Sequence, residues 1–221
     1  MKLSITQPEL GGYVAAQLNN FFPDHDRVAG SDLSEPLERA VQRAAFCFSH
    51  VRSRYFTRDG ETFLDHLNSD QYAMFLYLLS NEVHLAGQDG IATKLFYLNK
   101  ALHGIDCFYS VALPPIFLFS HPVGSVVGRA SYGNFFLVSQ NCTIGDNFDG
   151  DYPTIGEGVA MYAGASILGS STVGDNCALS ANALIFKTAI PANTVVTGQT
   201  PDARLRKTDR DLAAMHFMRD T

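Results

Sequence analysis

A six-residue repeat dominates the second half of the chain, from Val126 to about Thr200. A large apolar residue opens each hexad, and glycine recurs at the second position. Nine of the ten opening residues are valine, isoleucine, leucine or methionine. The ten are Val126, Tyr132, Val138, Ile144, Ile155, Met161, Ile167, Val173, Leu179 and Ile185. This period fits neither the 3.6 residues of a helical turn nor the alternation of an ordinary strand.

A period of six is typical of a parallel β-helix, in which each hexad forms a short strand and a turn, and three hexads complete one coil. The opening residue then points into a narrow interior, and glycine and asparagine take the tight corners. The repeat is interrupted once, where the polar segment 146–153 can leave the coil as a loop. We therefore expect a hexapeptide-repeat β-helix over residues 105–207.

The residues before the repeat predict an α-helical domain over 1–104. Helices are expected at about Pro8 to Phe22, Ser34 to Phe48, Ser69 to Leu85 and Gly90 to His103. The segment 72–85 is apolar nearly all round, which predicts that it is buried. In the C-terminal tail, residues 208–221, the amphipathic segment 209–218 predicts a short helix that caps the open end of the β-helix.

Composition narrows the function and the compartment. A net charge of −6, without a cluster of basic and aromatic residues, argues against nucleic-acid binding. The four cysteines lack disulfide or metal-type spacing, so free thiols in a reducing compartment are expected; they are Cys47, Cys107, Cys142 and Cys177. No signal-peptide pattern follows Met1, and no apolar run is long enough for a membrane span. A cytoplasmic protein without a membrane span is expected.

The sequence around His121 carries the clearest functional signal. The stretch 120–128 resembles the active-site segment of the serine O-acetyltransferases of the hexapeptide-repeat acyltransferase superfamily, which reads roughly Asp-His-Ala-Thr-Gly-x-Val-Val-Gly. Fifteen residues earlier, Asp106 falls where that family has the aspartate partner of its histidine. The resemblance extends in register to Gln140, Thr143, 161–169 and 191–203. It covers about residues 100–207.

This resemblance implies a left-handed β-helix and association as a homotrimer, and it leaves open whether two trimers join through the helical domain. It also implies acetyl-CoA as the acyl donor. His121 would be the general base that takes a proton from an acceptor hydroxyl, and Asp106 would orient the imidazole and stabilise its charged form. No nucleophilic side chain is needed, so Cys142 and Cys177 are not expected to carry the acyl group. Only two histidines follow residue 105, which leaves too few for a three-histidine zinc site, and no metal is expected.

For the cofactor, the resemblance places the pantetheine arm in a groove between coils of neighbouring subunits. Small residues there let an extended arm approach the backbone, and basic residues near the end of the repeat can meet the phosphates. The expected cofactor-binding residues are Gln140, Ala163, Gly164, Ala183, Gly198, Arg204 and Lys207.

Two departures from the family bear on the acceptor. Ser120 stands where the family has an aspartate, and Asp151 and Tyr152 stand where it has the arginine and histidine that hold the serine carboxylate. Asp151 would repel a carboxylate rather than bind it. We therefore expect Ser120, Asp151 and Tyr152 to contact the acceptor, which is either L-serine or a sugar hydroxyl of a surface polysaccharide or nucleotide sugar.

Two other functions fit the same residues. An N-acyltransferase acting on an amino sugar would use His121 in the same way, and a catalytically silent trimeric scaffold would use the helical domain as a docking surface. Retention of His121 and Asp106 at the family's spacing favours an enzyme. In the helical part, His66, Asp70 and His84 could face the same cleft, although ordinary surface or core roles also fit them.

Overall fold

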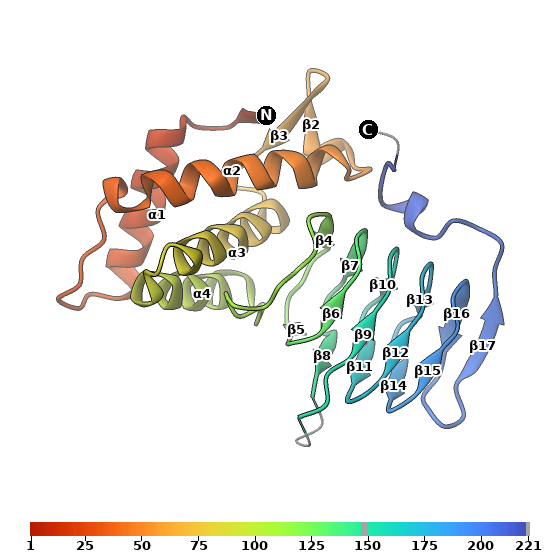
Figure 1. Cartoon of the computed structure of the whole chain (residues 1–221). Helices are drawn as coiled ribbons and strands as arrows, with labels where there is room; N and C mark the ends of the chain where they lie inside the picture. The colour runs from red at the N-terminus through yellow and green to blue at the C-terminus, as the bar shows by residue number, and fades with distance from the viewer. Residues whose placement is uncertain (147–149, 220–221) are drawn as a thin grey trace.

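The computed structural model describes residues 1–146 and 150–219. A bundle of helices sits over one end of a stack of short strands, and the chain runs from the bundle down the stack (Figure 1). The last helix of the bundle ends at His103, and the first parallel pairing of the stack involves Asp106. No helix in the described part of the chain is long and apolar enough to cross a membrane.

The four expected helices are present. They are α1 (Gln7–Phe21), α2 (Ser34–Ser49), α3 (Ser69–Leu85) and α4 (Asp89–His103). Two short 3₁₀ helices, η1 (Gly30–Leu33) and η2 (Arg54–Phe56), and a small sheet in the order β1–β3–β2 join them; its strands are Lys2–Leu3, Glu61–Leu64 and Thr57–Arg58. This sheet was not expected, because its strands are very short and β1 pairs with a segment far along the chain.

Helix α3 is the centre of the helical domain and packs against α2, α4 and the first strand of the stack. Its apolar surface is buried nearly all round, as predicted. The Tyr77 hydroxyl donates to the Val111 carbonyl oxygen at 2.6 Å, and its ring meets the Phe117 ring edge-on at 5.6 Å. The helical domain and the strands therefore share one core.

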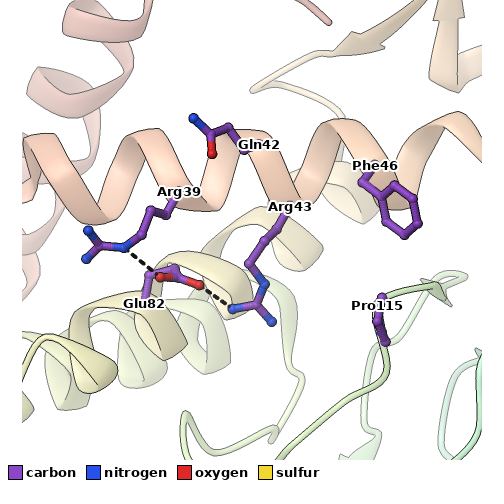
Figure 2. A pocket seen from close by; sticks show the side chains of 6 residues that line it. All are labelled: Arg39, Gln42, Arg43, Phe46, Glu82 and Pro115. Atoms are coloured by element: carbon purple, nitrogen blue, oxygen red, sulfur yellow. Dashed lines mark hydrogen bonds and ion pairs between the residues drawn. The ribbon is translucent and has the colours of Figure 1, made fainter.

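Ion pairs fasten α2 to α3. The Glu82 side chain is only 8% exposed, and its two oxygens accept hydrogen bonds from Arg39 Nε at 2.9 Å and Arg43 Nη1 at 2.7 Å. Figure 2 shows both arginines reaching from one face of α2, as expected for positions four residues apart. Beside them lies a cavity of about 500 Å³, whose lining includes Phe46 and Pro115.

The strands form three parallel sheets, here called I, II and III, that are the three sides of a parallel β-helix. Sheet I contains β4 (Phe117–Phe119), β7 (Phe136–Val138), β10 (Ala160–Met161), β13 (Ala178–Leu179) and β16 (Thr194–Thr197). Sheet II contains β5 (Val126–Val127), β8 (Thr143–Gly145), β11 (Ser166–Leu168) and β14 (Leu184–Phe186). Sheet III contains β6 (Ser131–Tyr132), β9 (Thr154–Ile155), β12 (Thr172–Val173) and β15 (Ala189–Ile190). Each coil passes through I, II and III in turn, so the molecule has a I–II, a II–III and a III–I corner.

The hexad-opening residues stack in register inside the coil, with one correction. Val126 was expected to point inward, but it is 42% exposed, whereas Val127 is buried and pairs with Ile144. The reason is a longer first turn: Phe119 and Val127 are eight positions apart, while their partners Val138 and Ile144 are six apart.

The C-terminal tail differs from the expected cap. Strand β17 (Arg204–Lys207) pairs antiparallel with β16, and the chain then returns along the III–I corner toward the helical domain (Figure 1). Only the short 3₁₀ helix η3 (Ala213–Met215) forms in the described part of this tail. Phe217 is fully buried and forms an antiparallel bridge with Val51. Burial of this aromatic side chain against the helical domain explains why the tail does not cover the open end.

Candidate functional site

His121 lies in the enlarged turn of the first coil, at the I–II corner. The two additional residues of this turn push it outward, and the His121 side chain is 82% exposed. Its backbone is in the left-handed region, with φ of 51°, which is unusual for histidine and marks a conformation that the surroundings hold in place. The imidazole is therefore presented at the surface on a fixed turn.

The carboxylate beside His121 belongs to Asp70, in the first turn of α3. Asp70 Oδ2 accepts a hydrogen bond from the His121 backbone N–H at 3.1 Å and lies 3.6 Å from His121 Nδ1. Asp70 Oδ1 is buried and has no hydrogen-bond partner among the described residues. The Asn68 side chain caps α3 by accepting from the Gln71 N–H at 3.2 Å, which fixes this turn. Nδ1 thus faces a carboxylate, and Nε2 is left for an acceptor.

Asp106, the expected partner of His121, is paired elsewhere. Its carboxylate accepts a hydrogen bond from Lys100 Nζ at 2.6 Å. Asp106 forms a parallel bridge with Val126, whose side chain points out of sheet II, so strand alternation sends the Asp106 side chain to the same outer face. Lys100, in the last turn of α4, meets it there. The expected pairing of Asp106 with His121 is therefore not formed in this structure.

A cavity of about 220 Å³ opens in front of His121, between the helical domain, the first coil and the tail. Its polar lining includes Arg52, Asp70, Ser120, His121 and His216. Ser120, one of the expected acceptor-binding residues, thus lies with His121. Sequence reasoning missed Arg52 and His216, and the one available signal was that His216 is the second of only two histidines after residue 105.

Asp151 and Tyr152 lie at a different edge of the molecule. They follow sheet II and precede sheet III, so they belong to the II–III corner, where the Arg129 guanidinium stacks over the Tyr152 ring at 4.8 Å. His121 belongs to the I–II corner. One chain therefore does not bring these two expected acceptor-binding residues to its own His121. Residues 147–149 of the same loop lie outside the described residues.

Of the three polar residues of the helical domain considered above, Asp70 alone reaches the His121 cavity. His66 Nδ1 lies 2.7 Å from the Ser4 hydroxyl. His84 Nδ1 lies 2.6 Å from Asp89 Oδ1. Both of these histidines have the ordinary structural role that the sequence also allowed.

Most of the expected cofactor-binding residues stack along the I–II corner, in successive coils after the His121 turn. The Gly164 N–H donates to the Gln140 carbonyl oxygen at 2.9 Å, and the Asn182 N–H donates to the Ala163 carbonyl oxygen at 2.8 Å. Gly198 ends the same column in the last coil, directly after β16. Residues far apart in the sequence thus form one continuous edge of small side chains and exposed turns.

Two of the expected cofactor residues, Ala183 and Lys207, do not contribute to this column. Ala183 is fully buried inside the coil, so its side chain cannot contact a ligand at the corner. Arg204 pairs with Thr197 and lies at the I–II end of β17, whereas Lys207 pairs with Thr194 at the opposite end of the strand. The antiparallel pairing of β17 therefore places Arg204, and not Lys207, near the column.

The four cysteines are free and buried, as expected. Burial raises the pKa of Cys47 to about 12 and also raises the pKa of Cys142 and Cys177. Because the thiolate is the reactive form, none of these three is suited to carry an acyl group. Within the described residues, no group of three histidine, cysteine or acidic side chains is placed to hold a metal ion.

Comparison with known proteins adds sequence and fold relatives. No family model matches the chain. The serine acetyltransferase of Helicobacter pylori is 28% identical over 129 residues, which cover 57% of this chain and 75% of that protein. Serine acetyltransferase 2 of Arabidopsis thaliana is 26% identical over 178 residues, which cover 79% of this chain and 51% of that protein.

Solved structures match over nearly the whole chain. The serine acetyltransferase of Vibrio cholerae has a TM-score of 0.71 at 21% identity, covering 93% of this chain and 81% of that one. A serine acetyltransferase solved in complex with CoA has a TM-score of 0.63 at 21% identity, covering 90% of this chain and 95% of that one. Likeness at this level of identity is a likeness of fold.

The helical domain followed by the three-sided coil is the fold of the solved serine acetyltransferases, a left-handed β-helix, as the resemblance implied. The chain resembles the serine acetyltransferases, which are hexapeptide-repeat acyltransferases, in sequence and in fold. The resemblance drawn from the residues around His121 is thus confirmed.

Proposed function

We propose that the chain transfers an acetyl group from acetyl-CoA to an acceptor hydroxyl. The observation that carries the proposal is the position of the exposed His121 at the head of the column of small residues on the I–II corner. Similarity to serine acetyltransferases, and to one solved with CoA, supports the same donor.

In the proposed reaction His121 Nε2 takes the hydroxyl proton while the acceptor oxygen attacks the thioester carbonyl. A carbon–oxygen bond forms, the carbon–sulfur bond breaks, and the imidazolium returns its proton to the departing CoA thiolate. Asp70 stabilises the imidazolium from the Nδ1 side, and backbone N–H groups of the corner stabilise the oxyanion. Transfer is direct, since the cysteines are buried. Asp106 could replace Asp70 in this role only after leaving Lys100.

We propose a homotrimer as the working assembly. The strands of sheets II and III carry no charged side chain, so two sides of the coil are suited to pack against other subunits. A neighbouring subunit is also the route by which Asp151 and Tyr152, at the II–III corner, would reach an acceptor. A dimer of trimers through the helical domain, and a cytoplasmic location consistent with the free thiols, are part of the same proposal.

Thiol release from acetyl-CoA tests this function. The wild-type chain is assayed with L-serine, nucleotide sugars and amino sugars, beside His121→Ala, Asp70→Asn and Asp106→Asn. We expect hydroxyl-dependent release that His121→Ala abolishes. Asp70→Asn should lower kcat by about 100-fold or more, within the usual range for loss of general-base assistance, with a smaller effect of Asp106→Asn.

Each alternative has its own outcome in this assay. A larger loss in Asp106→Asn than in Asp70→Asn would return the partner role to Asp106. Release with amino sugars alone would identify an N-acyltransferase. No release with any acceptor would favour the scaffold. Sedimentation of the same preparation checks the assembly, which should have three times the 24.1 kDa mass of the chain or twice that trimer mass.

A further inference from the structure

Arg52 brings a permanent positive charge to the His121 cavity. Its Nε donates to the Phe217 carbonyl oxygen at 3.4 Å, and its remaining guanidinium N–H groups have no hydrogen-bond partner among the described residues. Among the residues that line the cavity, Arg52 is the one lysine or arginine. An arginine with free N–H groups is suited to bind a carboxylate or phosphate through two parallel hydrogen bonds.

The C-terminal tail fixes Arg52 in this position. The Arg52 backbone N–H donates to the His216 carbonyl oxygen at 2.7 Å, and Val51 and Phe217 form an antiparallel bridge. The His216 ring, 3.0 Å from the Tyr162 hydroxyl, closes the same side of the cavity. Burial lowers the pKa of His216, so this ring is neutral near pH 7 and leaves Arg52 as the cation.

Two carboxylates, Asp151 and Asp70, bear on how an acceptor would bind, and they lie in different places. Asp151 lies at the II–III corner and would repel an anion, whereas Asp70 lines the cavity with its Oδ2 turned to His121 and its Oδ1 buried. The cavity thus offers a cation at Arg52 and the base at His121, whose backbone N–H is held by Asp70 Oδ2. These groups suit a molecule that carries an anionic group and the reacting hydroxyl.

We propose that the acceptor is anionic and that Arg52 binds its carboxylate or phosphate while its hydroxyl lies at His121. This inference rests on the proposed acetyl transfer. Arg52, just before η2, then supplies the positive charge that the loop containing Asp151 and Tyr152 lacks. At about 220 Å³ the cavity is smaller than the roughly 300–1,000 Å³ of pockets for drug-sized ligands, so a hydroxy acid or one charged sugar ring fits it.

Matched pairs of acceptors test the proposal. The pairs are L-serine with its methyl ester, glucuronate with glucose, and glucose 1-phosphate with methyl glucoside. Equilibrium binding in the presence of CoA and steady-state thiol release are measured for wild type, Arg52→Gln, Arg52→Lys and the control Arg58→Gln. Arg58 is an exposed arginine on β2 that stacks on Phe63 and does not line the cavity.

We expect the wild-type chain to prefer the charged member of at least one pair. Arg52→Gln should weaken binding of the charged acceptor and raise the KM for that acceptor by about 10- to 100-fold, because a charged hydrogen bond is lost. The kcat should change little. Arg52→Lys should retain part of the preference, and Arg58→Gln should behave as wild type. A carboxylate preference would identify a hydroxy acid or uronic acid, and a phosphate preference a phosphosugar.

Two results would overturn the proposal. One is the absence of any preference for a charged acceptor in wild-type binding, and the other is a preference that survives in Arg52→Gln. Because binding is measured separately from turnover, an inactive chain that still prefers the charged member through Arg52 would contradict acetyl transfer and leave the anion site supported.

Discussion

Several residues at the corners of the coil have left-handed backbone conformations. At the I–II corner, Asn141, Gly164 and Asn182 all have positive φ. The Asn182 side-chain oxygen occupies the space that a β-carbon on Gly164 would need. Glycine is required there for both its backbone freedom and the close approach of the next coil.

Gly164→Ala should therefore destabilise the protein by about 1–3 kcal/mol, the range for one strained backbone position. Gly145→Ala is the matched control in the preceding coil, since a β-carbon there meets nothing within 4 Å. Urea unfolding of the two variants checks the difference. Equal stability of the two would show that the corner relaxes without cost.

His103 links stability to pH at the end of α4. Burial lowers its pKa from 6.5 to about 4, and its Nδ1 lies 2.7 Å from Asn99 Oδ1. As pH falls below 6.5 the unfolded chain takes up a proton that the folded chain does not. This residue therefore contributes full stability above pH 6.5, and its contribution is lost between pH 6.5 and about 4.

His103→Gln should lose less stability than wild type over that pH window. The measurement is the free energy of unfolding in urea at steps from pH 7.5 to 4.5, taken as the difference between the two proteins so that the carboxylates cancel. A difference that is constant with pH would contradict a buried neutral imidazole.

At the scale of elements, sequence periodicity predicted those elements that depend only on residues close in the sequence. The four helices and the in-register stacking of the hexads follow from periodicity and helix-end signals, which depend on neighbours a few residues away. The sheet β1–β3–β2 and strand β17 depend on pairing rather than on pattern. Their positions could not be read from the segments themselves, because short strands carry little periodic signal.

The attachment of α2 to α3 rests on the Glu82 ion pairs of Figure 2. Glu82→Gln should destabilise the protein by about 1.5–3 kcal/mol, the range for hydrogen bonds to charged groups. Glu35→Gln should change stability by less than about 0.5 kcal/mol, because Glu35 is 86% exposed and lies 3.9 Å from Arg39. Chemical denaturation compares the two, and similar losses would mean that burial of Glu82 does not matter.

At the scale of the whole molecule, the C-terminal tail returns to the helical domain. The tail runs from the last coil back to the helical domain (Figure 1). There Phe217 packs against Phe135 of the coil and bridges to Val51 of the helical domain. This return places Arg52 and His216 in the His121 cavity. The candidate site therefore depends on packing of the C-terminal tail against the helical domain as well as on the repeat.

Phe217→Ala should cost about 3–5 kcal/mol, the range for truncating a buried aromatic residue. Met215→Ala, at a side chain that is 61% exposed in the same tail, should cost less than about 0.5 kcal/mol. Thermal and urea unfolding check both. A small effect of Phe217→Ala would mean that the tail does not contribute to the common core.

The sequence by itself determined the coil, the helices and the candidate base. Hexads, caps and the residues around His121 are local patterns, and each constrains its own segment whatever the rest of the chain does. The same patterns predicted most of the I–II column, because a fixed repeat brings corner residues such as Gln140 and Gly164 together automatically.

Only the tertiary structure decided what surrounds His121. The long first turn set the direction of the imidazole, strand alternation turned Asp106 toward Lys100, and packing of α3 on the first coil brought Asp70 to the histidine. Burial of the tail against the helical domain then added Arg52 and His216. These contacts join segments far apart in sequence, so they follow from how the elements bury their surfaces together and not from any single stretch.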